Sequence, residues 1–230
     1  MITLKALAMR HKISIVFLLS IATFISGCSN RFNDTAAYHS SGRAKPVVAV
    51  LPVIDSTSGD KKEYHWDRSE EFTTEIRKYI SDSSQLYLLN LAAGMNTAQT
   101  LNTPHVSEIS EDLLQSLSPA EFAIVSELID EKVIPYGLRN ANASRPHLSD
   151  IGSKISIALR VRVIDLRGKE PKIVLQEVIY QDHDVAKAYY NCDYKKCPWG
   201  SARYATTPMG IAHAKVIREL VAHVEGYVGL

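Results

Sequence analysis

The stretch Val47–Ile54, VVAVLPVI, decides the fold class of this chain. Both of its alternating faces are apolar, which is typical of a strand covered on both sides in the middle of an α/β sheet. Pro52 lacks an N–H donor, so the strand is expected to end, or to lie at a sheet edge, near that residue. The stretch therefore predicts a buried strand in a sheet that carries helices.

Two amphipathic helices are expected to pack on that sheet. The first is predicted over about 66–81, and its apolar stripe consists of Phe72, Ile76, Tyr79 and Ile80. Its first turn carries the acids Asp67, Glu70 and Glu71, which the helix dipole favours there. The second helix begins at Thr207-Pro208, an N-cap followed by proline at the first helical position. Its buried stripe consists of Ile217, Leu220, Val221, Val224 and Val228.

Three further segments are candidates for strands of the sheet. Lys154–Asp165 alternates apolar and polar residues, which is the pattern of a half-buried strand. Lys172–Gln181 returns as its hairpin partner. Phe122–Ile134 is ambiguous, because its apolar residues fit both a helical stripe and a strand. Ser118–Glu121 before it looks like a capping box and predicts at least one helical turn.

The remaining segments have weaker patterns. A short strand is predicted over 85–89, a polar loop over 91–105 and a short helix over 108–117. Together the segments predict a single-domain α/β sandwich over residues 46–230, with a mixed sheet of about four to five strands and helices packed on it.

The first 27 residues predict a cleaved signal peptide. Lys5, Arg10 and Lys12 precede the uncharged run Ile13–Ile25 and the small residues before Cys28. As a helix, this run spans about 20 Å, which is less than the roughly 30 Å hydrocarbon core of a membrane. A permanent transmembrane helix is therefore the weaker interpretation.

Cys28 is predicted to carry a lipid. The tetrapeptide Ile25-Ser26-Gly27-Cys28 resembles the lipobox of bacterial lipoproteins, in which the thiol receives a diacylglycerol and the new N-terminus an acyl chain such as palmitate. Two or more acyl chains anchor a protein stably. Ser29 is not Asp, and by the sorting rule of Gram-negative lipoproteins this favours the outer membrane, with the domain in the periplasm. An ordinary secretory signal that contains a cysteine is the alternative.

The mature chain is expected to begin with a flexible, polar tether over residues 28–45. Removing the signal peptide takes away three cations and no acid, so the formal net charge changes from +1 to −2. A nearly neutral protein lacks the basic surface that nucleic acid requires, and we expect no nucleic-acid partner.

Cys192 and Cys197 remain after Cys28 is assigned to the lipid. An even pair of cysteines in an exported protein favours a disulfide, here one that closes a tight loop. The spacing also fits half of a metal site, but the chain has no second cysteine pair, and His183 is the only histidine nearby. We expect a disulfide, no metal and no other cofactor. Because some periplasms leave such pairs reduced, the free dithiol is the alternative state.

Catalytic motifs are scarce. The chain has no GxSxG or HExxH motif and no phosphate-binding glycine loop, so we assign no catalytic residue and expect no enzyme activity. Asp182-His183-Asp184 is the one local cluster of metal-ligand types. In a strand it points both Asp side chains one way and His183 the other, which is a poor chelate. His213 and His223 face different directions on the last helix, so we interpret both as ordinary helix residues.

An aromatic segment before the last helix is the candidate partner-binding site. Its residues are Tyr189, Tyr190, Tyr194, Lys195, Lys196, Trp199, Arg203 and Tyr204. Aromatic and arginine side chains on a rigid loop have the composition of binding hot spots. The alternative is that these rings cover the sheet edge and fill space between the hairpin and the last helix, because large aromatics bury well in any core.

The order of these segments along the chain resembles that of a known protein family. The segments that carry it, besides the lipobox and the hairpin, are VVAVLPVIDST (47–57), WDRSEEFTTEIRKYI (66–80), AEFAIVSELIDEKVIPY (120–136) and TTPMGIAHAKVIRELVAHVEGYV (206–228). The chain is similar to the small lipoproteins of unknown function of chlamydiae. More distantly, it resembles the penicillin-binding-protein activator lipoproteins and the curli-channel lipoprotein. That resemblance implies an α/β sandwich in which 122–134 is a central strand entered from a short helical turn, and it transfers no catalytic residue. The cysteine-bounded aromatic loop departs from the activator proteins.

Three functions are compatible with these features. The first is a non-catalytic adaptor that hangs from the outer membrane and binds another envelope protein, with cell-wall synthesis and division proteins as candidate partners. The second is a self-assembling structural or secretion-type subunit, a homo-oligomer like the curli-channel relative. The third is an envelope enzyme with an unrecognised site. We expect the first.

Overall fold

The computed structural model describes residues 37–57, 65–90, 94–102, 110–135, 151–189 and 192–229. The predicted signal peptide, Cys28, Ser29 and the predicted tether up to residue 36 lie outside the described residues. Among the helices that are described, none is long and apolar enough to cross a membrane.

A mixed sheet of six strands forms the centre of the domain. Its strands are β1 (Val47–Val50), β2 (Ile54–Asp55), β3 (Tyr87–Leu88), β4 (Phe122–Pro135), β5 (Ile151–Asp165) and β6 (Lys172–Ala186). The order is β3-β1-β4-β5-β6, with β2 also paired to β4. β1 runs parallel to β3 and β4, whereas β4, β5 and β6 are antiparallel. The predicted α/β fold with a mixed sheet is confirmed.

The stretch 47–54 behaves as its sequence predicts. β1 ends at Val50, two residues before Pro52, and the chain re-enters the sheet as β2. β1 pairs with a strand on each side. Both faces of this stretch are apolar because each is covered: Val48 and Val50 lie in one hydrophobic core, and Leu51 lies in a second. The strand therefore lies inside the sheet and not at its edge.

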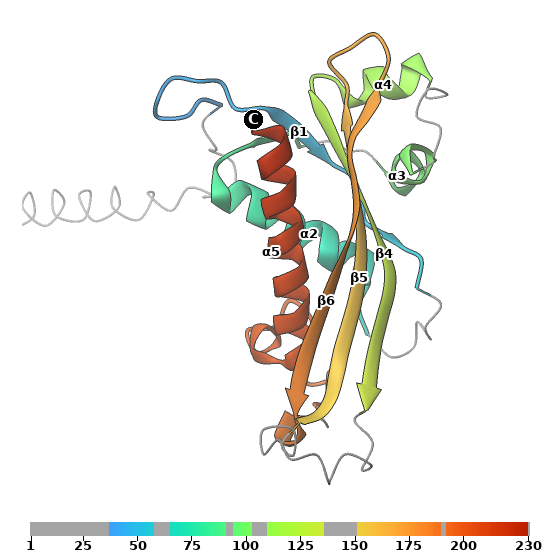
Figure 1. Ribbon diagram of the computed structural model, residues 1–230, viewed down its shortest axis with the longest axis vertical. Helices are drawn as coiled ribbons and strands as arrows, with labels where there is room; N and C mark the ends of the chain where they lie inside the picture. Colours follow the sequence, from blue (N-terminus) through green and yellow to red (C-terminus); the bar gives the residue numbers. More distant parts are fainter. Residues whose placement is uncertain are drawn as a thin grey trace, which may run out of the picture. The chain divides into compact units, whose positions relative to one another are not determined.

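Helices cover both faces of the sheet (Figure 1). α2 (Arg68–Ser83) and α5 (Pro208–Val228) pack on one face and share the larger core. α3 (Met95–Leu101) and α4 (Glu111–Leu117) pack on the other. The side chains of Asp67 and Thr207 cap α2 and α5 by accepting backbone N–H groups, as the predicted helix starts require. The predicted stripes of both helices lie in this larger core.

Two local predictions are wrong. The segment 91–105, predicted as a loop, contains α3, which buries Ala98 and Leu101. Its N-cap is Gly94, which has no capping side chain to mark the helix start in the sequence. Ser118 does not open a helical turn but ends α4, after which the chain enters β4 directly. The ambiguous segment 122–134 is a strand, as the family resemblance implies.

Residues 37–45, the last part of the predicted tether, form a small turn beside the end of α5. Tyr38 and Ala44 pair as an isolated antiparallel bridge. The guanidinium of Arg43 donates to the carbonyl oxygen of Gly229 at 3.1 Å. The two ends of the described chain therefore lie side by side.

Candidate functional site

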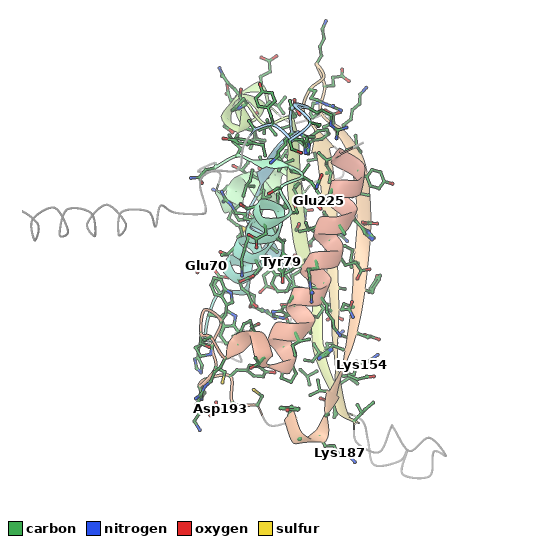
Figure 2. The ribbon with its side chains drawn as sticks, turned by 90° about the vertical axis from the view of Figure 1, so that its left-hand side faces the viewer. Glu70, Tyr79, Lys154, Lys187, Asp193 and Glu225 are labelled. Atoms are coloured by element: carbon green, nitrogen blue, oxygen red, sulfur yellow. The ribbon has the colours of Figure 1, made fainter. Side chains whose placement is uncertain are left out.

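The candidate site is the aromatic loop, residues 189–204, which connects the end of β6 to the start of α5. Figure 2 shows Asp193, within this loop, toward the same end of the domain as Lys187, whereas Glu225 lies toward the other end of α5. The loop therefore occupies one end of the domain.

The structure divides the predicted binding residues into two sets. Tyr194 and Trp199 are partly buried against the larger core, and Tyr204 is only 6% exposed. The outward set consists of Tyr189, Lys195, Lys196 and Arg203, of which Tyr189 is 63% exposed. Tyr190 lies outside the described residues. Three rings therefore fill space, as the alternative interpretation predicts, whereas the three cations and one ring face solvent. Partner binding by these exposed residues stays a prediction.

Hydrogen bonds fix the loop to α2. The indole N–H of Trp199 donates to Glu75 Oε1 at 3.5 Å. Gly200 follows with a φ of 84°, a left-handed conformation that favours glycine. Earlier in the loop, Asp193 accepts the backbone N–H of Lys195 at 3.1 Å and lies 3.3 Å from the amino group of Lys196. Residues 193–200 of the loop are therefore held by contacts within the loop and with α2.

Tyr204 enters a buried polar cluster between α2 and α5. Its hydroxyl donates to Glu71 Oε1 at 2.5 Å. Nδ1 of His213 lies 2.7 Å from the same carboxylate oxygen and 2.9 Å from the Tyr204 hydroxyl. The other carboxylate oxygen of Glu71 accepts the indole N–H of Trp66 at 2.7 Å. Glu71 thus joins three side chains from three segments of the chain.

The cluster continues as an ionic chain to the sheet. Nε2 of His213 lies 3.4 Å from Glu131 Oε2, on β4. Nη1 of Arg68 lies 3.5 Å from that same oxygen. Nη2 of Arg68 then binds Asp55 Oδ2, on β2, at 2.9 Å. We call the set Asp55, Arg68, Glu71, Glu131, Tyr204 and His213 the buried network.

Opposite charges hold His213 in its cationic form. Burial alone would lower its pKa, but the carboxylates of Glu71 and Glu131 outweigh it and raise the pKa of His213 from 6.5 to about 10. Both ring nitrogens of an imidazolium are donors, which fits a carboxylate on each side of the ring. The buried network then contains three carboxylates and two cations.

An imidazole, a carboxylate and a phenol in contact are groups that transfer protons in many enzymes. Here the side chains of Glu71 and His213 are 1% and 2% exposed, so no substrate reaches them without opening the core. The contacts of the cluster link separate elements of the fold. It ties the start of α5 and the aromatic loop to α2 and β4.

The two cysteines of the loop are free thiols in this structure. Burial, with smaller effects of Cys197 and Asp193, raises the pKa of the Cys192 thiol. The predicted disulfide is therefore not formed here.

The cluster Asp182-His183-Asp184 lies at the end of β6, as predicted. The Asp side chains face away from α5, and Asp182 binds the amino group of Lys154 at 2.7 Å. His183 points the other way and lies 3.2 Å from the amino group of Lys215 on α5. In the part of the chain that the structure describes, no group of three or more His, Cys, Asp or Glu residues could hold a metal ion.

Sequence reasoning missed the buried network. His213 is interpreted from the sequence as an ordinary helix residue, and Glu71 as one of three first-turn acids. Hydrophobic periodicity scores every acid as polar, so it cannot separate the buried Glu71 from the exposed Glu70. The one signal was Tyr204, which the sequence singled out for binding but which the structure uses as an anchor.

Residues 34–230 match a family of unknown function, DUF7499. The chain belongs to this family. A solved structure, the hypothetical protein CT253 from Chlamydia trachomatis, is 32% identical and has a TM-score of 0.67, over 80% of this chain and 98% of that chain. A search of the curated proteins finds no match.

Two further solved structures match at lower similarity. Lipoprotein GNA1162 from Neisseria meningitidis is 10% identical over 79% of this chain and 99% of that chain, with a TM-score of 0.39. The C-terminal domain of LpoB from Salmonella enterica is 15% identical over 59% of this chain and 81% of that chain, with a TM-score of 0.33. The resemblance to the chlamydial proteins, predicted from the sequence, is confirmed by the match to CT253.

Proposed function

We propose that this DUF7499 protein is an outer-membrane lipoprotein whose periplasmic domain is a non-catalytic adaptor. In this proposal Cys28 carries the lipid, and the aromatic loop binds another envelope protein. Proteins of cell-wall synthesis or division are the candidate partners.

One observation carries the proposal: the aromatic loop has a buried anchor and an exposed face. Tyr204 and the buried network hold the loop in place, while Tyr189, Lys195 and Arg203 point to solvent. A surface ordered before binding loses less conformational entropy when a partner docks. Exposed tyrosine and arginine side chains are also enriched at binding hot spots.

Site-specific photo-crosslinking tests this proposal in the full chain. A benzoylphenylalanine placed at Tyr189 is expected to give an adduct with a second envelope protein in living cells. The double variant Lys195→Glu, Arg203→Glu should reduce that adduct by more than half, because it reverses the charge of the exposed face without touching the anchor.

The matched control is Tyr227, which is 56% exposed near the end of α5. The same crosslinker at Tyr227 should give no adduct with that protein. Equal yields at both positions, or no adduct at Tyr189, would contradict the adaptor proposal. An adduct of two copies of this chain at Tyr189 would favour the self-assembling subunit instead.

The proposal includes a Cys192–Cys197 disulfide in the exported protein, formed by exchange with a disulfide-bearing oxidoreductase that leaves as the dithiol. Protein isolated under acid quench should then resist alkylation at both cysteines until it is reduced. Alkylation of both thiols without reduction would show that the pair stays free, as in this structure.

A further inference from the structure

A second feature shares Trp66 with the surroundings of the aromatic loop, because this ring contacts Tyr204 and also lines a cleft. It is a cleft of about 370 Å³ between the start of α2, β2 and α3. Its walls are formed by Ile54, Asp55, Trp66, Asp67, Arg68, Ser69, Met95 and Gln99. The volume is at the small end of the range for ligand sites, enough for one or two side chains.

The charges around the cleft favour a cation. Arg68, the one cation among the described lining residues, is buried and already bound to Asp55 and Glu131. Asp67 is exposed and forms no ion pair among the described residues, although its side chain accepts the backbone N–H of Ser69. Among the described residues, counting the buried network behind the wall, four carboxylates oppose two cations, an excess of negative charge that favours a cationic ligand.

The aromatic wall of the cleft is rigid. The indole N–H of Trp66 is bound to Glu71, and its ring stands edge-on to Tyr204 with 5.5 Å between ring centroids. Fixed in this way, the ring is ready to accept a cation against its face. Ile54 and Met95 add apolar surface to the same cleft.

We propose that this cleft binds a lysine or arginine side chain from a basic segment of the partner protein. The inference rests on the adaptor function proposed above and gives the chemistry of one contact. Ile54 and Met95 hold the aliphatic stem, while Trp66 and Asp67 hold the cationic end. A polyamine fits less well, because charges along its whole length would lie against the apolar wall.

NMR of the indole N–H groups tests this inference without the partner. The chain has two tryptophans, Trp66 and Trp199, so each spectrum carries its own control. Titration of the delipidated domain with acetyl-arginine methylamide is expected to shift the Trp66 signal and leave that of Trp199 in place. The uncharged isostere acetyl-citrulline methylamide should bind at least about three-fold more weakly.

Asp67→Asn is the decisive variant, because asparagine caps a helix as well as aspartate but carries no charge. It should weaken binding of the arginine probe about three-fold, whereas Asp82→Asn, an exposed acid near the end of the same helix, should not. A Trp66 signal that does not move, or equal binding of the citrulline probe, would overturn the inference.

A tighter response to spermidine than to the arginine probe would also overturn the inference, since it would assign the cleft to small polyamines. These outcomes are independent of the crosslinking at Tyr189. If the Trp66 signal does not shift but the crosslinker at Tyr189 gives an adduct, the cation-binding proposal for the cleft is rejected and the adaptor proposal stands.

Discussion

The charge on His213 decides how the residues of the buried network fit together. With a neutral ring, Arg68, which binds Asp55 and Glu131, would be the one cation left for the three carboxylates of the network, and Glu71 would lose its ion pair. A buried charge without a partner is strongly unfavourable, whereas an imidazolium between Glu71 and Glu131 satisfies both. The proton on this ring is therefore part of the folded structure.

This arrangement predicts a pH dependence of stability. Because folding raises the pKa of His213 from 6.5 to about 10, its stabilisation is complete below pH 6.5 and is lost as pH rises through about 10. The free energy of unfolding should decrease as the pH rises from 6.5 to about 10. The decrease should be smaller in the variant Glu71→Gln, which lacks one of the two carboxylates that raise the pKa. In ¹⁵N spectra at pH 8 both ring nitrogens should be protonated, and a neutral ring there would contradict the assignment.

Tyr204→Phe tests the anchor of the aromatic loop. The variant keeps the ring but removes the hydroxyl that donates to Glu71, and should lower the free energy of unfolding by about 1–3 kcal/mol. Tyr189→Phe removes the same atom from an exposed ring and should change stability by less than about 0.5 kcal/mol. Urea denaturation measures both, and equal effects would show that the buried hydrogen bond contributes nothing.

The residue scale is also where sequence reasoning was weakest. It found Tyr204 by residue type but left open whether the ring binds a partner or fills space, since an aromatic side chain carries no mark of whether it faces the core or a partner. Glu71, Glu131 and His213 were missed because they come together only when α2, β4 and α5 pack. Such long-range pairings cannot be obtained from a pattern within one segment.

At the scale of elements, sequence reasoning succeeded wherever one segment holds a complete signal. The twofold alternation of 154–165 and the capped stripe of 207–228 each predict an element that the structure contains. Helix α3 was missed because it has seven residues and no side-chain cap. The segment 122–134 needed the family resemblance, because most of its side chains up to Leu128 are buried and both periods fit.

The start of α5 depends on a close approach that only glycine permits. A Cβ on Gly210 would lie 2.2 Å from the carbonyl oxygen of Tyr204, so Gly210→Ala should push the loop away and lower the melting temperature by several degrees. Gly226, in the same helix, has open space around the same position. Gly226→Ala should therefore stabilise the protein by about 0.5–1 kcal/mol. Calorimetry of both variants compares them directly, and a destabilised Gly226→Ala would contradict the argument.

Across the whole domain, α5 runs between two ends with different contacts. At its C-terminal end, Arg43 of the predicted tether binds Gly229. At its N-terminal end lies the aromatic loop, and a helix of 21 residues spans about 30 Å between them. A lipid anchor that enters through the tether would leave the loop at the far end of the domain, available to a partner in the periplasm.

This geometry depends on attachment at Cys28, which the full chain can test. In a Gram-negative host, the wild-type protein should incorporate labelled palmitate and sediment with membranes, because two or more acyl chains bind stably to a bilayer. Cys28→Ser should abolish both, since serine lacks the acceptor thiol. Cys192→Ser is the matched control, as it removes a thiol of the aromatic loop and should leave labelling and sedimentation unchanged. If the wild-type protein sediments with membranes but carries no palmitate label, its N-terminal helix is uncleaved and serves as the anchor. That result would contradict attachment through a lipid on Cys28, and with it the placement of the aromatic loop at a distance from the outer membrane.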